Sequence, residues 1–428
     1  MSAEKAQVKV LKGKKLIDGN GGTPIQNGVV VIEGQHIKAV GSEGKVNVPA
    51  GAEVIDMGDC TLMPGLIDGC AFLMQFNREY FKNSKAASNT CPPQLQEIYG
   101  ILSGQISFEN GITTLVNGQG MNKYGEPVTA EGVAIRDAIE TGIIAGPRML
   151  VCGKAAVTHA HAGSEITADG PWELRKLVRR EFKKGADGIK TTAGGGIGGH
   201  LEGIEERHGT QDELDAIVDE CHAFGKFCVC HAQTVHQQRM SLRAKVDALV
   251  HIVYTDDETI KLIKESNTPL YPTLTHRSDR DIAELAAGGQ SDNVINKRKR
   301  TQQICFENFK KIHQAGIKLI MGSVHGVDWG AFEMEMYQDL GMTPMETILT
   351  ATKNVAEALK LDKITGTLDA GKFADIIAIN GDPSANIKVL RDRDNFRMVM
   401  KEGRIYIDKR PGHEKSVVQN WDWKFPDF

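Results

Sequence analysis

The chain has 428 residues, of which 41% are hydrophobic and 25% are charged, a composition typical of a globular protein with a large core. The formal net charge is -4 and no long basic run occurs, so we expect no nucleic-acid partner. The N-terminus has no apolar signal segment, no apolar stretch is long enough to cross a membrane, and the eight cysteines include no CxxC pair, so we expect a cytoplasmic protein with reduced, buried thiols and no membrane partner.

Both ends of the chain predict short β-strands. Residues 5–60 alternate or run in β-branched residues between Gly-rich turns, and residues 374–408 show the same pattern. We therefore predict one small β-sandwich domain that is built from residues 1–64 together with residues 366–428.

Between these ends, short apolar runs alternate with longer helical patterns such as DELDAIVDECHAFG and DDETIKLIKESN. The runs predict eight strands, over residues 61–69, 111–118, 148–153, 185–193, 226–232, 247–252, 268–274 and 317–323. Eight strand–helix units are the number in a (β/α)8 barrel, which makes this an α/β protein with a catalytic barrel over residues 65–365.

Polar side chains stand where several predicted strands end. Lys190, His231 and His251 close the fourth, fifth and sixth strands, and His325 follows the eighth. A single histidine at such a place is more often structural, but working residues of a (β/α)8 barrel gather at the carboxyl ends of its strands. A lysine that points into the barrel is costly unless it is neutralised or modified. Lys190, His231 and His251 together therefore indicate a functional site.

The sequence resembles the amidohydrolase superfamily, in the branch of imidazolonepropionase-like enzymes and dipeptidases that cleave Xaa-Pro amides. The resemblance covers nearly the whole chain and includes the segments TLMPGLIDG, TGIIAGPRML, KKGADGIKTTAGGG, AIVDECHAFGKFCVCHAQT and GTLDAGKFADIIAINGDP. It implies a (β/α)8 barrel with a β-sandwich from both chain ends, and commonly a homo-oligomer. It also implies two divalent metals, held by a His-x-His pair, a bridging carboxylated lysine, two single histidines and an aspartate.

This chain departs from that pattern at three ligand positions. The His-x-His pair is replaced by Cys70-Ala71-Phe72, and the Thr-Asp pair of the last strand by Ser323-Val324. All three lost ligands belong to the first metal, whereas Lys190, His231 and His251 match the ligands of the second. We therefore predict one divalent metal per subunit, by default zinc, with Lys190 as N6-carboxylysine because an ammonium group has no lone pair.

Cys70 leaves two interpretations open. A thiolate is a good zinc ligand, so Cys70 is a candidate metal ligand. Alternatively, Cys70 and Phe72 fill the emptied half-site with apolar bulk, which the size of Phe72 favours.

The lost aspartate is the family's general base, and Val324 cannot replace it. His325 is the candidate catalytic replacement, since histidine suits acid–base chemistry near neutral pH, although a structural role for it stays open and Asp328 is also close. His161 matches a family histidine after the third strand that contacts the substrate, while His159 replaces a glycine and is expected in a surface loop.

Two further residues are candidate substrate-binding groups. Tyr254 matches a family tyrosine that lines the pocket, and Arg277 suits a substrate carboxylate or, equally, a surface salt bridge. The Gly-rich segment 193–200 has no P-loop continuation and is interpreted as a lid over the barrel mouth.

These observations predict a metal-dependent hydrolase that cleaves an amide-like C–N bond, in an amide, urea, carbamate or cyclic amide, of a small-molecule substrate. Two alternatives stay open: a lyase, isomerase or decarboxylase on the same barrel, and an inactive binding protein. Incorporation of solvent oxygen into the product separates the hydrolase from the lyase.

Overall fold

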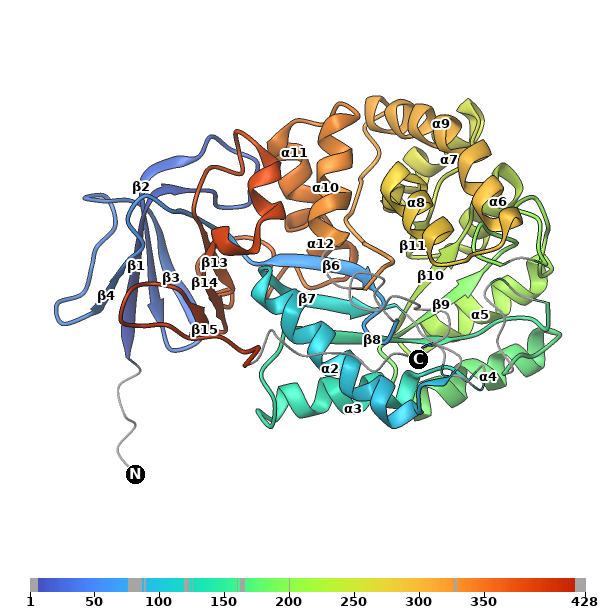
Figure 1. Ribbon diagram of the computed structural model, residues 1–428, viewed down its shortest axis with the longest axis horizontal. Coiled ribbons are helices and arrows are strands. Elements are labelled where there is room, and N and C mark those ends of the chain that lie inside the picture. Colours follow the sequence, from blue (N-terminus) through green and yellow to red (C-terminus); the bar gives the residue numbers. More distant parts are fainter. Residues whose placement is uncertain are drawn as a thin grey trace.

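The computed structural model describes residues 7–75, 87, 90–118, 122, 124, 126–159, 161, 166–199, 201–326 and 329–419. Asp328, a candidate for the missing general base, lies outside these residues. Two β-sheets organise the molecule: a mixed sheet at one end of its long axis, and a parallel sheet inside the larger, helix-covered part (Figure 1).

The smaller body is a mixed sheet that both chain ends build. Its strands are β1 (Val8–Leu16), β2 (Ile25–Glu33), β3 (His36–Ser42), β4 (Glu53–Asp56), β5 (Thr61–Pro64), β13 (Ile376–Ile379), β14 (Phe396–Lys401) and β15 (Arg404–Asp408). They follow the order β15-β14-β13-β5-β1-β2-β3, with β4 beside β1. The two chain ends join where β13 runs antiparallel to β5, with Ile377 opposite Met63.

The larger body is a parallel sheet in which the strands follow one another in chain order. These strands are β6 (Leu66–Ala71), β7 (Ile112–Asn117), β8 (Arg148–Lys154), β9 (Gly188–Thr192), β10 (Phe227–His231), β11 (Ala248–Val250) and β12 (Leu270–Tyr271). This arrangement confirms the predicted α/β class, with a parallel barrel sheet and a second sheet from both chain ends. The predicted first strand, 61–69, is divided between the two sheets, since β5 lies in the mixed sheet and β6 in the parallel one.

The predicted eighth strand, 317–323, is not a regular strand in the described residues. It makes one isolated bridge, between Leu319 and Leu270. Its backbone nevertheless binds both edges of the sheet: the Ile320 amide donates to the Leu270 carbonyl at 3.0 Å, and the Gly69 amide donates to the Met321 carbonyl at 3.0 Å. The segment therefore occupies the eighth position and joins β12 to β6 without regular strand pairing.

Helices cover the outside of the parallel sheet (Figure 1). They are α2 (Pro93–Glu109), α3 (Thr129–Glu140), α4 (Pro171–Lys183), α5 (Gln211–Ala223), α6 (Val235–Ala244), α7 (Asp257–Ser266), η1 (Leu274–Arg277), α8 (Asp279–Ala287), α9 (Asp292–Gln314), α10 (Trp329–Asp339), α11 (Pro344–Thr350), α12 (Lys353–Ala358), η2 (Ile387–Arg391) and η3 (Arg393–Asn395). None of these described helices is both long and apolar enough to cross a membrane.

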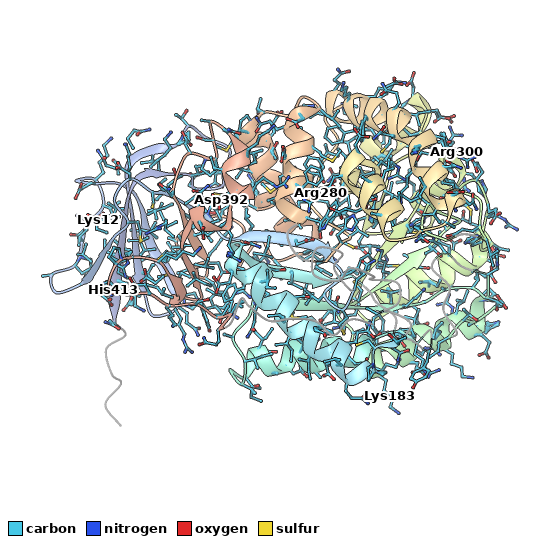
Figure 2. All side chains as sticks on the ribbon, viewed as in Figure 1. Lys12, Lys183, Arg280, Arg300, Asp392 and His413 are labelled. Atoms are coloured by element: carbon cyan, nitrogen blue, oxygen red, sulfur yellow. The ribbon has the colours of Figure 1, made fainter. Side chains whose placement is uncertain are left out.

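Helix α5 illustrates how the sequence places a helix on the barrel. Thr210 and Glu213 form a capping box, in which each side chain accepts a hydrogen bond from the other residue's backbone amide. The buried face of the helix joins the core cluster of the barrel through Leu214, Ile217, Val218 and Cys221. Charged side chains such as Lys183 and Arg300 lie at the periphery of the molecule (Figure 2).

Candidate active site

Consecutive parallel strands bring the predicted site residues to one end of the barrel. His231 is the last residue of β10, and His251 directly follows β11. Lys190 lies inside β9 rather than at its end, in register with Val229 of β10 and Lys154 of β8. The barrel mouth, meaning the carboxyl ends of these strands, is therefore where the polar groups meet.

Five histidine rings form a row across this mouth. The ring centroids are 4.2 Å apart for His161 and His231, 4.7 Å for His231 and His251, 5.8 Å for His251 and His276, and 4.1 Å for His276 and His325. His276, the fourth ring of the row, was not predicted from the sequence. Its only signal was its place after the seventh predicted strand, where a lone histidine is usually structural.

The hydrogen bonds of His231 and His251 leave one ring nitrogen of each available as a ligand. Nε2 of His231 lies 3.2 Å from the carbonyl oxygen of Gly195, which can only accept, so this nitrogen carries the proton and Nδ1 has the lone pair. Thr273 donates its hydroxyl proton to the Pro272 carbonyl and therefore accepts from Nδ1 of His251, which leaves the lone pair on Nε2. Such partners orient ligating histidines in metal sites.

Burial keeps both rings neutral. It is the main cause that lowers the pKa of His231 and of His251 well below the usual value, and nearby cationic or protonatable groups, Lys190 and Arg277 among them, lower it further. A neutral imidazole is the form that binds a divalent metal, so this pair fits the expected ligand set.

Around Lys190, Cys70 and Phe72 occupy the positions where the family has ligands of the first metal. Nζ of Lys190 donates to Sγ of Cys70 at 3.6 Å and lies 4.5 Å from the centre of the Phe72 ring. Cys70 is buried, and burial raises the pKa of its thiol. A protonated thiol beside an aromatic ring is the arrangement expected if these residues fill the emptied half-site, while the ligand role of Cys70 stays a prediction.

A second lysine, Lys154, shares the site and was not predicted. It ends β8, is buried, and lies in register with Lys190. Burial, followed by the charge of Lys190, lowers the pKa of Lys154 to about 8. The signal for it was present, since Lys154 ends a predicted strand just as the histidines do.

In the row of histidine rings, His276 lies between His251 and His325, so His325 is the more distant of the two from the predicted metal ligands. Its ring packs between His276 and Trp329, whose ring centroid is 4.1 Å away, and its Nε2 lies 3.8 Å from Oδ1 of Asp281. Arg298 holds the other oxygen of Asp281 in an ion pair. The catalytic role of His325 stays a prediction.

Three residues at the mouth have positive φ angles, which are rare for side chains of their kinds. The angles are 72° at His251, 54° at Thr273 and 50° at Val324. Two of the three are β-branched, for which this conformation is strained, and such strain concentrates at functional sites.

The Gly-rich segment packs onto the histidines. A Cβ on Gly196 would lie 2.5 Å from Cε1 of His161 and 2.9 Å from Cε1 of His231. His161 in turn binds Oε1 of Glu202 through Nδ1 at 2.5 Å. Residues 193–197 are buried. In this structure the segment therefore forms a wall of the site, and its role as a lid stays a prediction.

Arg277 is fully buried, so the interpretation as a surface salt bridge is wrong. Its guanidinium donates to Oε1 of Gln233 at 3.2 Å and to Oγ1 of Thr301 at 3.3 Å, and it forms no ion pair with the residues that the structure describes. The backbone carbonyl of Gln233 accepts a hydrogen bond from the Tyr254 amide at 2.9 Å, so Arg277 supports the loop that carries Tyr254. The substrate-binding roles of both residues stay predictions.

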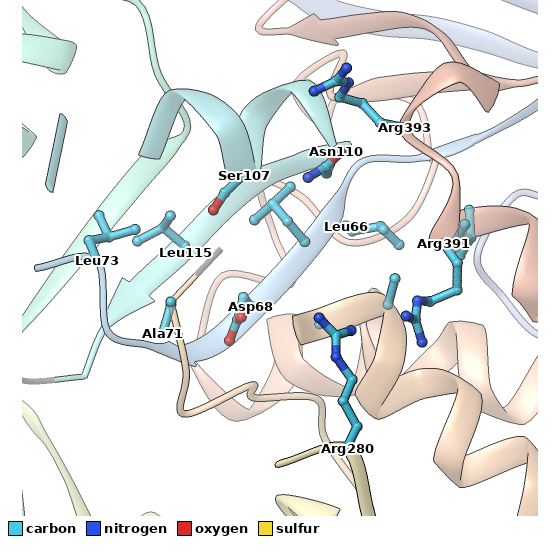
Figure 3. A pocket seen from close by; sticks show the side chains of 15 residues that line it. Leu66, Asp68, Ala71, Leu73, Ser107, Asn110, Leu115, Arg280, Arg391 and Arg393 are labelled. Atoms are coloured by element: carbon cyan, nitrogen blue, oxygen red, sulfur yellow. The ribbon is translucent and has the colours of Figure 1, made fainter. Parts of the chain in front are cut away.

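A separate pocket lies between β6, α2 and α10 (Figure 3). Arg280, Arg391 and Arg393 point into it, with Asp68 among its lining residues. No histidine lines it. Two other groups have ligating atoms close enough to share an ion, namely His276 with Asp281 and His325, and His159 with Glu206 and His208.

The fold and this mouth identify the class of protein. The model of the amidohydrolase family matches residues 61–406, and the chain belongs to this family. It is a hydrolase of that family, whose members usually bind metal, and the predicted resemblance is confirmed.

Individual relatives support the assignment along almost the whole chain. The chain is 25% identical over 450 residues to the ochratoxinase of Aspergillus niger, with 96% of this chain and 88% of that protein covered. It is 23% identical to an imidazolonepropionase of Geobacillus kaustophilus, with 90% and 91% covered. The crystal structure of a Xaa-Pro dipeptidase with bound methionine superposes with a TM-score of 0.83 at 27% identity, covering 94% of this chain and 100% of that one.

Proposed function

We propose that this chain hydrolyses an amide-like C–N bond of a small molecule, in an amide, urea, carbamate or cyclic amide, at a site for one divalent metal. Lys190, His231 and His251 would hold this metal, which we take to be zinc, with Lys190 carboxylated on Nζ. The names of its relatives support a C–N bond, since a Xaa-Pro dipeptidase cleaves an amide.

One observation carries the proposal: the residues that would hold the second metal are all present, and other side chains occupy the place of the first metal. His231 and His251 are buried, neutral and oriented by hydrogen bonds to Gly195 and Thr273. Phe72, which cannot be a ligand, lies on Lys190 in the other half. Two imidazoles and one carboxylate-like oxygen leave a fourth position open, as catalytic zinc sites require.

In the proposed hydrolysis, the metal and the histidines at the mouth have separate roles. A bound divalent metal supplies Lewis acidity, which activates water and polarises a carbonyl. In this proposal, His161, which is held by Glu202 and stacked on His231, contacts the substrate carbonyl. In the same proposal, His276 and His325 carry a proton to the leaving nitrogen, the role that Val324 cannot fill.

Arg277 favours a substrate with a negative charge. Its buried guanidinium has no ion pair among the described residues, and its charge is close enough to lower the pKa of His231 and His251. A buried cation beside the mouth attracts anions into it and stabilises a carboxylated lysine. We therefore include a carboxylate-bearing amide among the first substrates to be screened.

The test compares metal content per subunit in the wild type, His231→Ala and the control His222→Ala, by elemental mass spectrometry of protein purified without added metal. His222 is exposed and pairs with Asp247 at 3.0 Å, away from the mouth, so its variant keeps the wild-type content. We expect His231→Ala to lose about one equivalent and to lose hydrolysis of amide, urea and carbamate substrates. Equal metal content in His231→Ala and the wild type would overturn the proposal.

Reaction in water enriched in oxygen-18 provides the second readout. Hydrolysis places one solvent oxygen in the acyl product, whereas a lyase, isomerase or decarboxylase does not need to. A product without the label would move the function to one of these classes.

A further inference from the structure

Above the mouth, a second group of ligating side chains lies outside the proposed active site. It comprises His159 from the loop after β8, and Glu206 and His208 from the loop after β9. Nε2 of His208 is 3.4 Å from Oε2 of Glu206, and Nε2 of His159 is 3.8 Å from the same oxygen. The three ligand atoms all lie within 4.8 Å of one another.

We propose that His159, Glu206 and His208 form a second zinc site, which clamps the loop after β8 to the loop after β9. Two imidazoles and a carboxylate are a common zinc ligand set, and water completes the tetrahedron. With zinc–ligand bonds of about 2.0–2.1 Å, the ligand atoms of a tetrahedral site lie about 3.3 Å apart. The two distances to Glu206, 3.4 Å from His208 and 3.8 Å from His159, are close to this value, and the two histidines are within 4.8 Å of each other, so side-chain rotations would bring all three to a zinc ion.

The state of His208 provides independent support. Its side chain is 1% exposed, and the ring nitrogen that faces the cluster, Nε2, contacts Glu206. Its one contact with Glu206 is long for a hydrogen bond. Buried polar atoms are normally satisfied, so a metal at Nε2 would give this buried ring a better partner than the long contact with Glu206 does.

The charges around the cluster favour a cation. Among the residues that the structure describes, the carboxylate of Glu206 pairs with the two histidines and with no lysine or arginine. The group of His276, Asp281 and His325 differs, because Arg298 pairs with Asp281 and donates to the His276 carbonyl. A guanidinium in that position opposes a metal ion, so we assign no second metal there.

The cluster is connected to the active site through Gly195. The Gly195 amide donates to the Glu206 carbonyl at 3.0 Å, and the Gly195 carbonyl accepts from Nε2 of His231 at 3.2 Å. His161, two residues after His159, stacks on His231. Zinc in the cluster would therefore fix the wall that orients His231 and His161. The inference does not depend on the reaction that the mouth catalyses.

The experiment measures zinc bound per subunit after dialysis of the full chain against micromolar Zn²⁺. His159 is 74% exposed, so His159→Ala should fold as the wild type does, and Glu206→Gln removes the charge while keeping the shape. We expect both variants to bind one equivalent less than the wild type and His222→Ala, the control for an exposed histidine beside a carboxylate. Equal zinc in His159→Ala and the wild type would overturn the inference.

Hydrogen exchange gives a readout of the clamp itself. Zinc should slow exchange of the backbone amides of residues 194–199 and 201–208 in the wild type and in His222→Ala, but not in His159→Ala. Protection that is the same in all three proteins would show that zinc acts elsewhere. Loss of metal on His231→Ala is a separate outcome, so failure of the proposed function and failure of this inference are distinguishable.

Discussion

At the scale of single residues, the protonation states of His231 and His251 control what the barrel mouth can bind. Both rings are buried, and their pKa values lie well below the usual value because the charged form is poorly solvated there. In the unfolded chain, each ring takes up a proton near pH 6.5. The folded and unfolded states therefore bind different numbers of protons in mildly acidic solution.

This difference predicts that the metal-free protein loses stability on acidification. Below about pH 6.5, the unfolded state binds a proton at each histidine that the folded state does not, so the free energy of unfolding falls with pH by about 1.4 kcal/mol per unit for each ring. The loss continues until the pH reaches the lowered pKa values of the folded state. Urea unfolding with a chelator present, between pH 7.5 and pH 5 in steps of roughly half a unit, measures the slope across this window.

His251→Gln is the matched variant for this measurement. It removes one of the two titrating rings and should reduce the slope by about 1.4 kcal/mol per pH unit, whatever it does to the stability at pH 7.5. An unchanged slope would mean that His251 titrates alike in both states.

At the scale of structural elements, the segment after β9 determines how closely the backbone approaches the histidines. Gly196 has no room for a Cβ, which would lie 2.5 Å from His161 and 2.9 Å from His231. Only a glycine lets this wall contact both rings at once.

Gly196→Ala should therefore displace His231 and weaken metal binding by about 10- to 100-fold, the range found when groups that orient a ligand are changed. Gly198→Ala is the control in the same segment, since its Cβ would be 3.4 Å from His161, at the edge of ordinary contact. Competition with a chromogenic chelator measures both affinities. If the two variants have equal affinities, the close approach at Gly196 does not orient His231.

At the scale of the whole molecule, one arginine connects the two sheets. Arg148, the first residue of β8, pairs with Asp375 just before β13 and with Glu402 just after β14, each at 2.7 Å. The side chain of Asp375 is 1% exposed, so its charge depends on this partner.

Arg148→Met should lower the free energy of unfolding by about 3–5 kcal/mol, because it leaves Asp375 buried without its partner. The double change Arg148→Met with Asp375→Asn should recover part of this loss. Lys14→Met, which breaks the exposed pair with Asp59, should change stability by less than about 1 kcal/mol. Chemical denaturation of the four proteins measures these differences, and equal effects of Arg148→Met and Lys14→Met would contradict the proposed connection.

The local pattern of the sequence determined the fold class and the positions of the main site residues. Alternating and apolar runs predicted eight barrel strands, of which seven are regular strands, and both chain ends as one β-domain. Lys190, His231 and His251 could be located because each stands at a strand end or within two residues of it, which in a parallel sheet puts them at one mouth. The departures at Cys70, Phe72 and Val324 were visible from the resemblance to the family's ligand motifs.

Only the tertiary structure determined the neighbours of these residues and their charge states. His276 and Glu202 join the site because loops of separate strands converge there, which no local period records. The burial of Arg277 likewise depends on how η1 packs against α9. Neutral histidines, a lysine with a lowered pKa and the cluster of His159, Glu206 and His208 all follow from desolvation and proximity across the fold, and these exist only once the chain is packed.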